Sequence, residues 1–158
     1  MTDALKEFSA EFAKQIRRFN QLVDSKAPAD SDAMRELSSI LSRLLDVGER
    51  CPDAWSDTEI EAPELDHDAI QKMISKRFPE FGFYNSSNPS MGPMDDAKIE
   101  VNDASYDVYD IYCDLNDSLW YFDNDEYELG LWSAKLLFGH WGRHAINLKS
   151  YLHKQLYE

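Results

Sequence analysis

Apolar residues recur at steps of three and four along most of the chain, which is the spacing of one face of an α-helix. In residues 3–25 this apolar stripe falls at Leu5, Phe8, Phe12, Ile16, Phe19 and Val23. Residues 31–50 repeat the pattern, and Asp30 or Asp32 can cap the start of that helix by accepting backbone N–H groups. A shorter stripe predicts a third helix that begins near Asp68 and stops at Pro79.

The C-terminal half predicts two further helices, one from about Ala104 to Phe122 and one from about Asp125 to Tyr157. Residues 82–97 are rich in Gly, Pro, Asn and Ser, which indicates a flexible or functional loop. Alternating apolar and polar residues never extend beyond about four positions, so no sheet is expected. The pattern therefore predicts an all-α fold, an antiparallel bundle of four long helices plus one short helix, in a single domain over residues 1–158.

Charge narrows the classes of function. The 158 residues include 30 acidic and 16 basic side chains, a formal net charge of −14. Such a chain repels nucleic-acid phosphates and cannot form a polybasic anchor on a membrane surface, so neither nucleic acid nor membrane is an expected partner. No apolar run approaches the roughly 18 residues of a membrane span, and the first residues lack the apolar core of a secretory signal. With Cys51 and Cys113 as free thiols, the expected location is the cytoplasm.

The acidic residues are concentrated in two places. Residues 53–68 hold seven acids and no base. The predicted helix 104–122 and its preceding residue carry five aspartates at steps of four and three, which form one stripe: Asp103, Asp107, Asp110, Asp114 and Asp117. Like charges one turn apart destabilise an exposed helix slightly. The stripe is therefore either a solvated face or a set of carboxylates that turn inward toward a cation, a basic partner or histidines.

The last predicted helix contains the segment His140-Trp141-Gly142-Arg143-His144. His140 and His144 lie one turn apart on one face, a spacing that lets both imidazoles reach one metal ion. That face also carries apolar residues, so each ring N–H needs a partner, and a carboxylate of the preceding helix is the natural one. The Glu-x-x-His signature of di-iron bundles is absent. Three arrangements remain open: a metal site, a His–Asp hydrogen-bond network, or exposed side chains.

Residues 100–156 resemble an uncharacterised bacterial family, number 5063 in the domain-of-unknown-function series. The segment Asp110–Leu115 (DIYCDL), with Asp107 one turn earlier, and the segment His140–Ala145 (HWGRHA) carry the resemblance. The resemblance implies a small bacterial helical protein and no particular activity. The positions that match the family's motif are Asp107, Asp110, Asp114, His140 and His144, together with Trp141 and Gly142, which are expected to serve helix packing.

Two hypotheses of function follow from these patterns. The chain has no phosphate-binding loop, nucleophile elbow or Cys-x-x-Cys motif, which favours a non-enzymatic module that binds a basic protein through its acidic surface and needs no cofactor. The alternative is a helical metal site for Zn, Mn, Fe or Ni, with His140, His144, Asp110 and Asp114 as ligands. A further idea, mimicry of nucleic acid, requires carboxylates spaced along an exposed surface.

Overall fold

The computed structural model describes residues 2–87 and 98–158. Within them the chain forms four long helices, two shorter helices and one pair of strands. The long helices are α1 (Asp3–Val23), α2 (Ser31–Glu49), α4 (Ala104–Asp123) and α6 (Phe138–Tyr157); the shorter ones are α3 (His67–Arg77) and α5 (Tyr127–Leu136). The expectation of a mainly helical chain is therefore confirmed.

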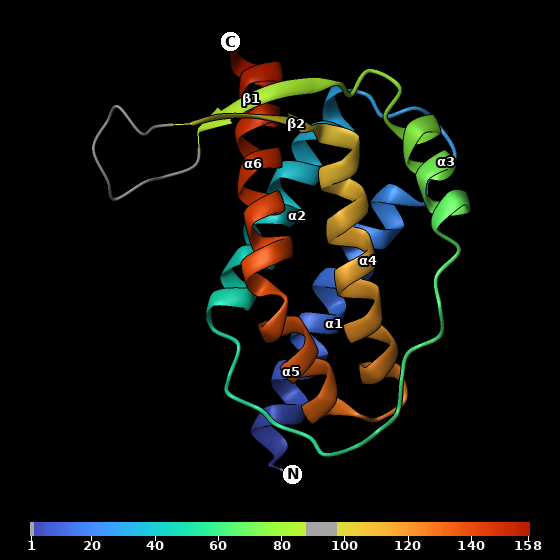
Figure 1. Cartoon of the computed structure of the whole chain (residues 1–158), viewed down its shortest axis with the longest axis vertical. Helices are drawn as coiled ribbons and strands as arrows, with labels where there is room; N and C mark the ends of the chain where they lie inside the picture. The colour runs from blue at the N-terminus through green and yellow to red at the C-terminus, as the bar shows by residue number, and fades with distance from the viewer. Residues whose placement is uncertain (1, 88–97) are drawn as a thin grey trace.

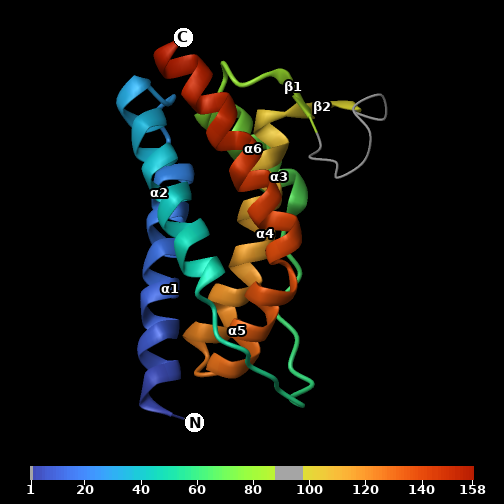
Figure 2. The same cartoon turned by 90° about the vertical axis from the view of Figure 1, so that its left-hand side faces the viewer.

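The long helices contact one another in a ring, α1 with α2, α2 with α6, α6 with α4 and α4 with α1. Figure 2 shows α1 and α2 on one side of the molecule and α4 and α6 on the other. In Figure 1, α4 descends from the end where the strands lie, while α6 rises toward the C-terminus beside it, so the two helices are antiparallel. The α3 helix packs against α4 on the side away from α6 (Figure 1).

The apolar stripes of the sequence form the core between these helices. The side chains of Phe12, Ile16 and Phe19 on α1 are fully buried, as are Val108 and Ile111 on α4, among many others. Burial of such stripes is what stabilises helices of this length, since isolated helices are marginal in water. The start of α2 is capped by Asp30, whose carboxylate accepts from the backbone N–H of Ala33 at 2.8 Å.

The prediction of one helix over residues 125–157 is wrong. The helix is interrupted at Leu137, whose backbone leaves the helical conformation, and the segment becomes α5 and α6. The break reorients the chain so that α5 contacts α1 and α4, while α6 packs along α2 and α4. Trp141, the largest fully buried side chain, bridges the two helices because its indole N–H donates to the carbonyl of Ala134 at 2.9 Å.

The prediction of a purely helical chain is also corrected, by an antiparallel ribbon of β1 (Phe83–Ser87) and β2 (Ile99–Asp103). Residues 83–87 of the predicted loop 82–97 are thus a strand, and residues 88–97 lie outside the described residues. The pairing sets Tyr84 opposite Asn102 and Phe83 opposite Asp103. The ribbon lies at the end of α4 and α6 where α4 begins (Figure 1). None of the described helices combines the length and apolar character needed to cross a membrane.

Candidate functional site

The aspartate stripe of α4 faces α6, and three of its members meet the two histidines there. Asp107, Asp110 and Asp114 come from successive turns of α4, and His140 and His144 from successive turns of α6. The helical spacing on each side explains why these side chains line one seam. The structure thus brings together all five polar residues singled out in the sequence.

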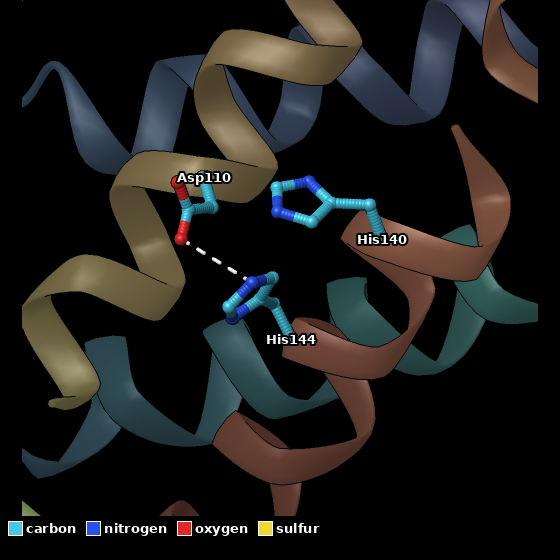
Figure 3. A group of neighbouring side chains, drawn as sticks. All are labelled: Asp110, His140 and His144. Atoms are coloured by element: carbon cyan, nitrogen blue, oxygen red, sulfur yellow. Dashed lines mark ion pairs between the residues drawn. The ribbon is translucent and has the colours of Figure 1, made fainter. Parts of the chain in front are cut away.

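His144 is held between two carboxylates. Its Nδ1 donates to Oδ1 of Asp107 at 2.7 Å, and its Nε2 lies 3.3 Å from Oδ2 of Asp110 (Figure 3). The hydrogen bond to Asp107 raises the pKa of the His144 imidazole above its usual value, against the opposing effect of burial. Two acceptors, one on each ring nitrogen, favour the protonated ring when no metal is bound.

Asp107 is the buried member of the cluster, with 2% of its surface exposed. Its second oxygen accepts a hydrogen bond from the phenol of Tyr84 on β1. Both carboxylate oxygens are therefore satisfied, which is the condition for burying such a group without a large cost. Burial and the Asp107 partner raise the pKa of Tyr84, so its phenol keeps the proton that it donates.

His140 repeats the arrangement one turn earlier on α6. Its Nδ1 donates to Oδ2 of Asp114 at 2.7 Å, while about half of its side chain (52%) is exposed. Burial raises the pKa of Asp114, and the hydrogen bond from His140 opposes that rise. The two imidazoles meet edge to face with ring centroids 4.8 Å apart. Asp110, His140 and His144 each offer one ligand atom, and these atoms lie within 4.8 Å of one another.

The ends of the stripe do not join this cluster. Asp103 caps α4 instead, because its carboxylate accepts from the backbone N–H of Ser105 at 2.9 Å. Asp117 lies beyond the histidine pair, half-buried, and burial raises its pKa. The reading of the stripe as a solvated face therefore fails for Asp107 and holds only in part for its neighbours.

Trp141 and Gly142 pack as the motif suggested. A Cβ atom added to Gly142 would lie 2.8 Å from the ring of Phe138, and one added to Gly48 on α2 would lie 2.6 Å from the same ring. Because neither glycine has a side chain, the Phe138 ring can pack where α2 and α6 meet, beside the buried Trp141.

Two residues near α4 were not singled out in the sequence. Tyr84 comes from a segment predicted as a loop, and only its place on β1 brings it to Asp107. His67, the first residue of α3, lies 2.6 Å from the Tyr109 hydroxyl through its Nδ1 and 4.0 Å from the Cys113 sulfur. Burial raises the pKa of the Cys113 thiol to about 11, which makes it a weak nucleophile.

Comparison with known proteins gives a fold and a family. The protein BF1032 from Bacteroides fragilis, known from its crystal structure, is similar with a TM-score of 0.70 at 19% identity, over 94% of this chain and 95% of that chain. At this identity the likeness concerns the fold. No curated protein matches the sequence. The resemblance expected for residues 100–156 extends over nearly the whole chain, which belongs to the family described as Domain of unknown function (DUF5063), whose model matches residues 3–158.

Proposed function

We propose that the chain binds one divalent transition-metal ion between α4 and α6, with Asp110, His140 and His144 as its ligands. The observation that carries the proposal is the way both histidines are held. Each Nδ1 donates to a carboxylate, Asp107 for His144 and Asp114 for His140, which leaves Nε2 as the ring nitrogen for an ion, and that of His144 already lies beside Asp110. Metal-binding histidines are held in this way, because the carboxylate fixes the ring and makes the other nitrogen more basic.

The separations fit one ion after a small movement. Ligand atoms at about 2.0–2.2 Å from a tetrahedral metal lie roughly 3.3–3.5 Å from one another. Nε2 of His144 and Oδ2 of Asp110 are already 3.3 Å apart. The widest separation in the cluster is within 4.8 Å, so a shift of about 1.5 Å closes it. His140 has room for that shift, since its side chain is half exposed.

The charges of the cluster also fit a bound divalent cation. Three carboxylates of α4 converge on two imidazoles, which leaves excess negative charge in a partly buried place when the rings are neutral. A divalent cation at the ligand atoms offsets that charge. Asp114 thereby supports His140 rather than binding the ion, which refines the expectation that it is a ligand.

Two imidazoles and one carboxylate suit Zn, Fe, Mn or Ni. Three protein ligands are one fewer than a closed structural zinc site uses, and the half-exposed His140 leaves the site accessible to solvent. Metals held in this way keep positions for water or substrate and act as Lewis acids. The donor set is therefore that of a reactive metal centre rather than of a structural one.

Metal analysis of protein purified without a His-tag tests this proposal. We expect about one equivalent of metal per chain, measured by mass spectrometry and by calorimetric titration. Asp110→Asn and His144→Gln should lose it, whereas His153→Gln, an exposed histidine of the same helix, should keep it. Absence of metal from the wild type, with no rise in melting temperature on adding Zn, Mn, Fe or Ni, would leave only the His–Asp network.

A second candidate function is binding of a basic protein, and it is favoured by residues 53–68 rather than by α4. All seven acids of that segment are exposed, and Asp53 is paired with Lys135. Asp107 cannot contribute to such a surface, because it is buried. The inward stripe also leaves mimicry of nucleic acid without the row of exposed carboxylates that it needs. Recovery of a basic partner that is lost at high salt supports this function, and salt-insensitive recovery argues against it.

A further inference from the structure

A separate pocket lies where β1, the start of α4 and α3 meet. Its volume is about 210 Å³. Four aromatic residues line it, namely Phe81, Phe83, Tyr106 and Tyr109, and Asp103 is the acidic residue among the described lining residues. Gln71, Ile74 and Ser75 of α3 also line it. No lysine, arginine or histidine occurs among the described residues that line it.

The local structure explains why these side chains gather. Phe83 pairs with Asp103 across the ribbon, and directly opposed residues of an antiparallel pair present their side chains on the same face. Asp103 is followed by Tyr106 and Tyr109 at steps of three, so all three lie along one side of the first turns of α4. The rings of Tyr106 and Tyr109 stand nearly perpendicular, at 74°, with centroids 6.0 Å apart.

Two of these aromatic residues are exposed at the pocket rather than buried in the core. Phe83 is 79% exposed and Tyr106 is 54% exposed. Large apolar side chains gathered at the rim of a pocket mark binding sites more often than they serve stability. Their aromatic character decides what the site can bind, because the faces of Phe and Tyr rings attract cations.

Charge points to the same class of ligand. The carboxylate of Asp103 is half-buried at the pocket and uses one oxygen to cap α4, and among the described residues no hydrogen bond occupies the other oxygen. The net charge of −14 draws cations toward the chain from a distance. Aromatic rings beside a carboxylate are the surroundings in which proteins hold ammonium and methylated ammonium groups.

We infer that this pocket binds the ammonium group of a lysine side chain, free or methylated, presented by a partner protein. The ribbon favours a protein over a small molecule as the source of that group. Ile99 and Val101 lie on the same outward face as Phe83 and are 76% and 70% exposed, so an apolar surface continues beyond the pocket. Among the described residues, β1 and β2 pair only with each other, so each strand has one edge without a strand partner, which is where a peptide adds in β-augmentation.

Titration of the full chain with short peptides tests the inference. The probes are acetylated, amidated tripeptides with a central lysine, trimethyllysine or norleucine, followed through the NMR resonances of Phe83 and Tyr106. Norleucine keeps the apolar stem and lacks the cation. We expect both cationic peptides to shift these resonances saturably, and the norleucine peptide to bind at least about tenfold more weakly, since it loses both the ring contacts and the carboxylate.

Variants separate the contributions without disturbing the fold. Asp103→Asn keeps the helix cap, because Asn is as good a capping residue as Asp, and should weaken the lysine peptide about fivefold. Phe83→Ala removes an exposed ring and should weaken both cationic peptides by a similar factor. Trp55→Ala, which removes an exposed aromatic side chain outside the pocket, should leave binding unchanged.

Three results would overturn the inference. Equal binding of the norleucine peptide would mean that the pocket recognises apolar stems only. Saturable binding of choline without binding of either cationic peptide would assign the pocket to a small molecule. Unchanged resonances of Phe83 and Tyr106 with every probe would mean that it binds no cation. All three measurements are independent of metal, because the pocket shares no residue with the ligands proposed between α4 and α6.

Discussion

At the scale of single residues, the two histidines of α6 differ in how much they contribute to folding stability. His144 satisfies the buried Asp107, so His144→Ala leaves a buried carboxylate with Tyr84 as its remaining partner and should cost about 1–3 kcal/mol of unfolding free energy. His140 is half exposed, so His140→Ala should cost less than about 1 kcal/mol. Urea unfolding in the presence of EDTA measures both. Equal stability of the His144 variant and the wild type would mean that Asp107 does not depend on this partner.

In the metal-free protein, the raised pKa of His144 fixes the direction in which folding stability changes with pH. Because the folded pKa lies above the unfolded value of 6.5, the stabilisation is fully present below about pH 6.5 and is lost as the pH rises through the folded pKa. An NMR titration of the ring protons should therefore show a midpoint above 6.5, and Asp107→Asn should lower it. A midpoint at or below 6.5 in the wild type would contradict the assigned hydrogen bond.

At the scale of elements, the sequence predicts the helices, which depend on neighbouring residues. It misses the strand pair, which depends on residues far apart in the chain. The stripe of Val108, Ile111 and Leu115 predicted α4 almost to its observed ends, because helical spacing is a property of neighbouring residues. The ribbon was missed because Ile99 and Val101 alternate over only five residues, face outward, and pair with a strand on the far side of residues 88–97.

In the candidate site, too, the sequence identifies the residues of each helix but not the contacts between the helices. Helical spacing identified all five polar residues and placed each set on one face. Which aspartate meets which histidine depends on how far α6 is shifted along α4, and that shift follows from packing of the whole core. Tyr84 could not be assigned to Asp107, since its position depends on the ribbon. Gly139 and Gly142 indicate a close helix contact or a bend in the predicted helix 125–157, but not that the helix breaks before them, at Leu137.

The close packing of α2 against α6 predicts that a side chain added at Gly142 destabilises the protein. Gly142→Ala places a methyl group 2.8 Å from the Phe138 ring, which cannot retreat toward Gly48 without a second close contact. We expect a loss of about 1–3 kcal/mol in unfolding free energy. Gly139→Ala is the matched control on the same helix, because its added methyl group meets nothing within 4 Å. Thermal denaturation compares the two, and equal melting temperatures would contradict the tight packing.

At the scale of the whole molecule, the net charge of −14 opposes the compact state through repulsion among carboxylates. Raising NaCl from about 0.02 to about 0.5 M should therefore raise the melting temperature by a few degrees, because salt screens exposed charges beyond a few ångströms. KCl should act alike, which distinguishes screening from binding of one ion. A melting temperature that falls with either salt would show that ion pairs outweigh repulsion.

Cobalt is the sharpest probe of a metal site between α4 and α6 with Asp110, His140 and His144 as ligands. Titration of the untagged, EDTA-treated full chain with Co²⁺ reports the ligand field of the bound ion through its visible absorption. We expect saturation at one equivalent per chain in the wild type and in His153→Gln, with no such absorption in Asp110→Asn. Absence of saturable absorption from the wild type, or an unchanged spectrum in Asp110→Asn, would rule out a metal bound by these three residues.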